Sequence, residues 1–132
     1  MNLPAKNLIY KELAENGSVE LRYSKGVNIA LYRNSNFSIG NCIVMFNNSD
    51  RGKKLISTLT KTLKIKPEKE GGLINKYSFF VNNSFEHMER IINIIISTFH
   101  DCKFILRKKG INYIDYIAII DEGIICEKNS FK

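Results

Sequence analysis

The pattern of apolar and polar positions is clearest between residues 77 and 99. A short aromatic run at 77–81 is followed by the polar triplet Asn82-Asn83-Ser84, and apolar residues then recur at the spacing of an α-helix. This order predicts a strand, an N-cap and a helix with one buried face. The residues expected on that face are Met88, Ile91, Ile92, Ile95 and Phe99.

The first third of the chain predicts one helix followed by three strands. Residues 4–15 suit a helix that Asn16-Gly17 would end, because both residues accept the left-handed conformation at a helix C-terminus. Strands are expected at 19–23, 28–33 and 37–46, and the short turns between them predict an antiparallel meander. Gly40-Asn41 in the third strand indicates a bulge or bend. The positions expected to share the buried face of the first helix are Leu8, Ile9, Leu13 and Ala14.

The rest of the chain predicts a second helix, a connector and further strands. The polar run 47–50 supplies an N-cap for the second helix, and residues 66–73 are polar enough to predict a flexible loop. After the third helix, strands are expected at 103–107, 111–120 and 124–127, with a frayed end at 128–132. The apolar positions of the second helix are Leu55, Ile56, Leu59 and Leu63.

These elements predict a single α+β domain over residues 1–132. Their order is α-βββ-α-β-α-βββ, which favours helices packed on one face of an antiparallel sheet. A chain of 132 residues is long enough to bury a core without disulfides or metals. Cys42, Cys102 and Cys126 are odd in number and lack C-x-x-C spacing, so we expect unpaired thiols. With no signal-peptide pattern, the expected location is the cytoplasm.

The predicted strand 111–120 is apolar on both faces. A strand of this kind is covered twice within its own chain or pairs with another chain. On this ground we expect a homodimer. The longest apolar cluster, at 91–99, is broken by Asn93 and Ser97 and is too short to span a bilayer, so we expect no association with a membrane.

No set of residues predicts catalysis. His100 and Cys102 are too close in sequence to converge at a helix end, and a zinc site would need two further ligands. The acidic residues near the C-terminus lack the arrangement of a metal-dependent nuclease, which is the weakest alternative, and no Gly-rich loop suits a nucleotide. We expect no catalytic residue, no metal site and no cofactor. Those acidic residues are Asp115, Asp121, Glu122 and Glu127.

The charge of the chain changes this picture. A formal net charge of +7 and a pI of about 9.4 favour polyanionic partners. The leading interpretation is a non-catalytic binding protein that acts on nucleic acid or a nucleoprotein complex. The alternative is an inhibitor, immunity or anti-defence module whose basic face binds an acidic protein surface. The residues expected to make these contacts are Lys53, Lys54, Lys61, Lys64, Arg107, Lys108, Lys109, Arg22, Arg33 and Tyr113.

Aromatic residues between the basic ones would supply base stacking if they are exposed. Buried tyrosines would instead belong to the core or to an interface between copies. The sequence leaves both open for Tyr23, Tyr32, Tyr113 and Tyr116.

Overall fold

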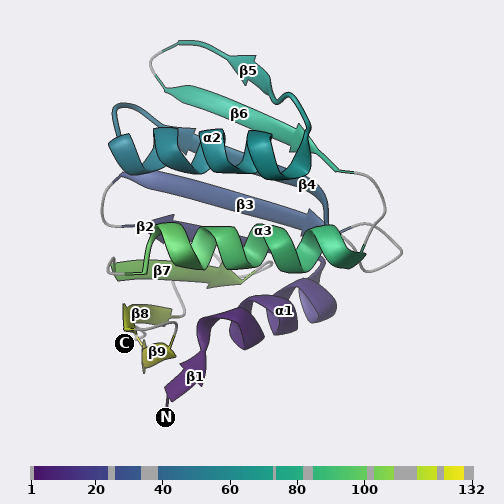
Figure 1. Cartoon of the computed structure of the whole chain (residues 1–132). Coiled ribbons are helices and arrows are strands. Elements are labelled where there is room, and N and C mark those ends of the chain that lie inside the picture. Colours follow the sequence, from purple (N-terminus) through teal and green to yellow (C-terminus); the bar gives the residue numbers. More distant parts are fainter. Residues whose placement is uncertain are drawn as a thin grey trace.

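A computed structural model gives the fold of the chain. It describes the backbone of residues 2–23, 26–33, 39–72, 74–81, 85–100, 103–108, 116–121 and 124–129. Side chains are described for residues 6–7, 9–23, 26–33, 40–72, 74–81 and 88–100. Figure 1 shows an α+β domain in which the helices cover one face of an antiparallel sheet, as the sequence predicts.

Within the described ranges there are three helices and nine strands. The helices are α1 (Ala5–Asn16), α2 (Asp50–Leu63) and α3 (Phe85–Thr98). The strands are β1 (Asn2–Pro4), β2 (Ser18–Tyr23), β3 (Val27–Arg33), β4 (Ile39–Phe46), β5 (Glu68–Glu70), β6 (Asn75–Phe80), β7 (Lys103–Lys108), β8 (Tyr116–Asp121) and β9 (Ile124–Asn129).

The strands form one sheet in the order β1-β9-β8-β7-β2-β3-β4-β6-β5. The predicted meander is present as β2, β3 and β4, and β7 pairs with β2. This pairing joins the C-terminal strands to the N-terminal half of the domain. Between β3 and β4 the register shifts, because Tyr32 pairs with Asn41 while Arg33 pairs with Ile39. Gly40 is the extra residue, so the predicted bulge is confirmed.

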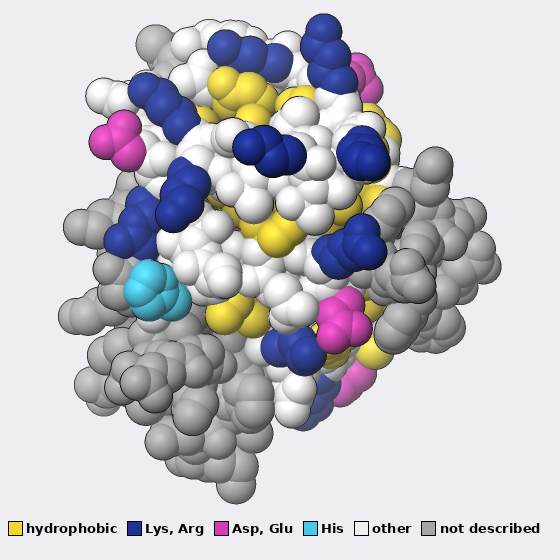
Figure 2. Space-filling model, in the orientation of Figure 1, with side chains coloured by type: hydrophobic (Ala, Val, Ile, Leu, Met, Phe, Trp, Pro, Cys, Tyr) yellow, Lys and Arg dark blue, Asp and Glu magenta, His cyan; other side chains and the backbone are white. Residues whose placement is uncertain are grey.

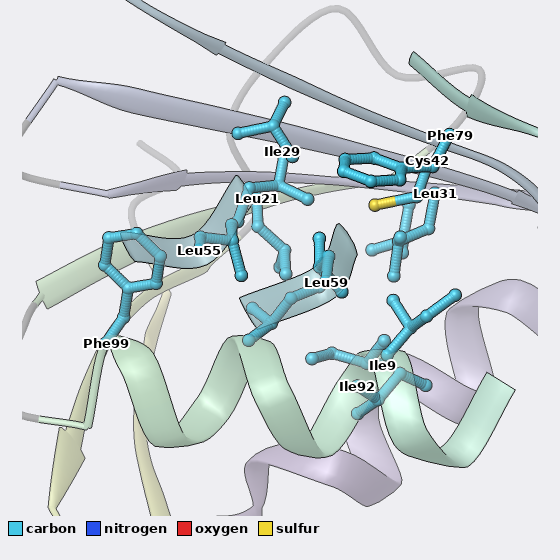
Figure 3. Packing of buried hydrophobic residues seen from close by; sticks show 14 of the residues in the cluster. Ile9, Leu21, Ile29, Leu31, Cys42, Leu55, Leu59, Phe79, Ile92 and Phe99 are labelled. Atoms are coloured by element: carbon cyan, nitrogen blue, oxygen red, sulfur yellow. The ribbon is translucent and has the colours of Figure 1, made fainter. Parts of the chain in front are cut away.

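The core lies between the sheet and the helices. Leu21, Ile29 and Cys42 are fully buried on three neighbouring strands and point toward the helices, as Figure 3 shows. Leu55 and Leu59 of α2 meet them from the helical layer. All five residues predicted for the buried face of α3 are buried: Met88, Ile91, Ile92, Ile95 and Phe99. The three helices lie on this face of the sheet, and within the described residues no helix covers the other face, which we call the open face (Figure 1). Alternate side chains of each strand point to the open face.

Some local expectations are wrong. On α1, Ala14 is exposed and Glu12 is buried instead, where its carboxylate accepts a 2.8 Å hydrogen bond from Asn16 Nδ2. The predicted loop at 66–73 contains the short edge strand β5, which pairs with β6. The last strand was predicted to end at residue 127, but β9 extends to Asn129, so the first two residues of the predicted frayed end belong to a strand. The proposed N-cap at 82–84 and residues 111–115 lie outside the described part of the chain.

Candidate functional site

Helix α2 has its ends fixed by local interactions. Ser49 is the N-cap, and its hydroxyl accepts a 3.0 Å hydrogen bond from the backbone N–H of Gly52. At the other end Lys64 adopts a left-handed conformation with φ 56°, and its N–H donates to the carbonyl of Thr60 at 2.9 Å. The helix therefore begins and ends at defined residues, and this fixes which of its side chains share one face.

Three exposed lysines lie on the side of α2 that faces away from the sheet, and a fourth follows at its C-cap. Lys53, Lys54 and Lys61 fall within an arc of about 100° when successive residues are rotated at 3.6 per turn. Leu55, Leu59 and Leu63 are buried on the opposite side. Lys64 is exposed where the helix ends. We call Lys53, Lys54, Lys61 and Lys64 the α2 lysine stripe.

The α2 lysine stripe carries charge that the described residues do not neutralise. Among those residues, none makes a hydrogen bond or an ion pair with the four ammonium groups. In Figure 2 basic side chains are spread over the helix-covered face, and acidic side chains are sparse there. Each ammonium group thus has its three N–H donors available to water or to an anion.

A fifth basic residue of α2, Arg51, has a structural role. Its Nη1 donates a 2.9 Å hydrogen bond to the carbonyl of Thr98, at the end of α3. The guanidinium group therefore links the start of α2 to the end of α3, where carbonyls lack partners within their own helix. Its position in the sequence, beside Lys53 and Lys54, gives no sign of this difference.

The predicted arginine sites of the first hairpin are not on the face that carries the lysine stripe. Arg22 is exposed on the open face of the sheet, where its Nε donates to Asn28 Oδ1 at 3.1 Å. Arg33 is half-buried, and its Nε donates to the carbonyl of Leu13 at 2.7 Å near the end of α1. The α2 lysine stripe and Arg22 thus lie on opposite sides of the domain. Arg33 instead stabilises the C-terminal end of α1.

The remaining predicted contacts fall at the limit of what the structure describes. Arg107 and Lys108 belong to β7, where their Cα atoms pair with Glu20 and Val19 of β2. Their side chains, together with Lys109 and Tyr113, lie outside the described residues.

The aromatic candidates have different environments. Tyr23 is buried and stacks on Phe99 with ring centroids 4.1 Å apart, so it belongs to the core. Tyr32 is 45% exposed on the open face of the sheet. Phe80, which is not among the aromatic residues predicted to bind, is 55% exposed on the same face. The alternation of β6 was the available signal, since Phe79 and Phe80 cannot both face the core.

The titratable groups give no catalytic arrangement within the described residues. Burial raises the pKa of the Cys42 thiol to about 12, which makes it a poor nucleophile at neutral pH. His100 is exposed, and its Nδ1 lies 3.1 Å from the carbonyl oxygen of Ser97. No group of three or more His, Cys, Asp or Glu in the described ranges is placed to hold a metal ion. His87, Cys102 and the acidic residues of the C-terminal hairpin lie outside the described side chains.

Two further findings concern the whole fold. Among the described residues, no helix has the length and the apolar character that crossing a membrane requires. In comparisons with known proteins, no protein-family model matches the chain, and no curated protein or solved structure matches it.

Proposed function

We propose that this protein is a non-catalytic, cytoplasmic nucleic-acid-binding protein that contacts the phosphate backbone through the α2 lysine stripe. The observation that carries this proposal is the stripe itself: three exposed lysines on α2 and a fourth at its C-cap, all of which lack a partner among the described residues. Phosphate oxygens would satisfy both the charge and the donors of these ammonium groups.

Helix stability does not account for the whole stripe. Cations are favoured near the C-terminal end of a helix, which suits Lys61 and Lys64. Lys53 and Lys54 lie at the opposite end, just after the first turn, where the helix dipole offers a cation no stabilisation. The presence of two exposed lysines there supports a role in binding.

The placement of α2 favours contacts that do not depend on base sequence. The helix packs against α3, and its buried side lies on the sheet, so the exposed side that carries the lysines is the one open to a partner (Figure 1). Such a helix can lie along a phosphate backbone without entering a groove. Phosphate contacts set position and affinity but carry no direct sequence information.

An acidic protein surface is the second partner that a basic helix can bind. The composition of the stripe favours nucleic acid, because lysine is depleted in the buried part of protein interfaces and the stripe contains no aromatic residue. Lysine is a common ligand of phosphate, which it binds as a point charge.

A homodimer remains part of the proposal on sequence grounds. The pattern that supports it is the strand 111–120, which is apolar on both faces in the sequence. Light scattering coupled to size-exclusion chromatography gives the mass directly: twice 15.2 kDa supports the dimer, and a mass of 15.2 kDa contradicts it.

The proposed function is tested by titrating the protein against fluorescently labelled duplex DNA at several salt concentrations, with polyglutamate as an acidic polymer without phosphate. Phosphate binding predicts a linear fall of log K with log salt, and four contacts give a slope of about −3.6 on duplex DNA. The proposal is contradicted if the protein does not bind DNA even at about 50 mM salt, or if it binds polyglutamate as tightly as it binds DNA.

A further inference from the structure

The open face of the sheet carries two exposed aromatic rings in one row. Tyr32 pairs with Ser18 on one side and with Asn41 on the other, and Asn41 pairs with Phe80. The row across β2, β3, β4 and β6 is therefore Ser18, Tyr32, Asn41 and Phe80. We call it the aromatic row.

The rings of this row are accessible. Tyr32 is 45% exposed and Phe80 is 55% exposed. Among the described residues, Ile74 is the other large hydrophobic residue of comparable exposure, and it precedes β6 outside the row. A large aromatic surface that stays in contact with water costs hydration free energy, which a flat ligand on the rings would recover.

We propose that the aromatic row is a stacking site for the unpaired bases of single-stranded nucleic acid. This inference rests on the proposed function and specifies a second ligand surface for it. Bases stack on exposed aromatic side chains of a sheet without strong sequence preference, because every base has a π-face.

The spacing of the two rings suits two separate bases. Adjacent strands lie about 4.7–4.9 Å apart, so the backbones of Tyr32 and Phe80, which flank β4, are about 9.5 Å apart. Asn41 lies between them on β4 and is half-buried, so it separates the two rings.

The distribution of charge on the open face favours this end of the sheet. The aromatic row contains no acidic residue. Among the residues whose side chains are described, the acidic ones of this face are Glu20, Glu68 and Glu70, which lie in the two rows further along the strands. Glu70 forms a 3.7 Å ion pair with Lys76. Strand β7 ends at Lys108, which pairs with Val19 of β2. Val19 is next to Ser18 of the aromatic row, so β7 ends at the same end of the sheet as the row.

The polar members of the row make a protein partner less suitable than a nucleic acid. Ser18 and Asn41 alternate with the two rings, so the exposed apolar surface is interrupted. An uncharged aromatic row on a chain of net charge +7 matches a polymer that offers both stacking faces and negative charge.

The test compares an oligo-dT strand with an abasic strand of equal length, using fluorescence anisotropy at one salt concentration. The native protein should bind oligo-dT more tightly, because the abasic strand keeps the phosphates and lacks the bases. Tyr32→Leu and Phe80→Leu keep an apolar side chain and remove the ring, so each should weaken oligo-dT binding by about 5- to 150-fold. Neither should alter binding to the abasic strand, and Phe80→Tyr should retain most of the affinity.

Ile74→Ala is the matched control, since it removes an equally exposed apolar side chain outside the row and should leave both affinities unchanged. Equal affinity for the two strands, or Leu variants that bind oligo-dT as the native protein does, overturns the stacking site while the proposed function stands. A change of oligomeric state in the Leu variants also overturns it, because the row would then be a contact between copies. Failure to bind duplex DNA contradicts the proposed function separately.

Discussion

Gly52 in the first turn of α2 lies directly against the ring of Phe46 on β4. A Cβ atom at position 52 would be 2.6 Å from Cδ2 of Phe46 and 2.7 Å from Cγ. Both residues are buried, so the ring has little space into which to move. The absence of a side chain at Gly52 therefore sets how closely the start of α2, and with it Lys53, approaches the sheet.

Gly52→Ala should lower the free energy of unfolding by roughly 1–3 kcal/mol, the usual cost of overpacking a core. This is the reverse of the effect of helix propensity, which favours Ala over Gly by about 1 kcal/mol. Urea denaturation measures the change, and Ser57→Ala, at an exposed position of the same helix, should stay within about 0.5 kcal/mol of the native protein.

A double-mutant cycle identifies the cause of the loss. Phe46→Leu should remove part of the clash, so the cost of Gly52→Ala should be smaller in that background. A Gly52→Ala protein as stable as the native one, or purely additive effects of the two substitutions, would show that the two residues do not restrict each other.

Cys42 should resist alkylation in the folded protein. Burial raises the pKa of its thiol to about 12, so at pH 8 about one molecule in ten thousand carries the reactive thiolate. In a Cys102→Ser/Cys126→Ser background, labelling by iodoacetamide should be slow without denaturant and should become rapid through the urea transition. Rapid labelling of the folded protein would contradict the buried position.

The same thiol should make stability depend on alkaline pH. Its folded pKa of about 12 exceeds the unfolded value of about 8.5, so the unfolded chain releases the proton first as the pH rises. The contribution of the Cys42 thiol to the free energy of unfolding is constant below about pH 8.5 and is lost progressively between about pH 8.5 and pH 12.

Between pH 7 and pH 10, the native protein should therefore lose about 2 kcal/mol more than Cys42→Ala. Urea titrations of both proteins at the two pH values measure this difference. All other titratable groups are the same in the two proteins, so the comparison cancels their contributions, and parallel curves would contradict the raised pKa of the thiol.

Arg51 and Lys53 should differ in their effect on stability although both are basic residues of α2. Arg51→Ala removes the 2.9 Å hydrogen bond to Thr98 and should cost about 1.5–3 kcal/mol, the range for hydrogen bonds to charged groups. Lys53→Ala changes an exposed side chain and should stay within about 0.5 kcal/mol. Thermal or urea denaturation of the two variants compares them, and a stable Arg51→Ala protein would contradict the structural role.

The fold was predictable where one residue pattern extends over several turns or strands. The buried face of α3 follows from five apolar residues at helical spacing, and Gly40 marks its bulge because glycine weakens a regular strand. Strand β5 was not predictable, since Glu68, Lys69 and Glu70 have low β-propensity and are ordered only by the edge of β6.

The candidate site was predictable residue by residue but not as a surface. Helical periodicity places the lysines of α2 opposite Leu55 and Leu59, which needs no tertiary information. Whether Arg22 joins them depends on which face of β2 the helices cover, and this is decided by packing between distant segments. Phe80 was missed because an apolar run does not show which of its residues faces the core.

The α2 lysine stripe is tested most directly by comparing two double variants of equal charge. Lys53→Gln/Lys61→Gln removes two lysines of the stripe, and Lys6→Gln/Lys11→Gln removes two lysines of α1, which lies on the far side of α3 (Figure 1). Both variants lower the formal net charge from +7 to +5. The measurement is the slope of log K against log salt for duplex DNA.

The stripe variant should give a slope less steep than the native protein by about 1.8, because each lost phosphate contact changes it by about 0.9. The α1 variant should keep the native slope, since α1 is outside the proposed site and Lys6 already forms a 3.3 Å ion pair with Glu89. Equal changes of slope in the two variants would show that binding follows net charge alone, which contradicts a phosphate site on α2.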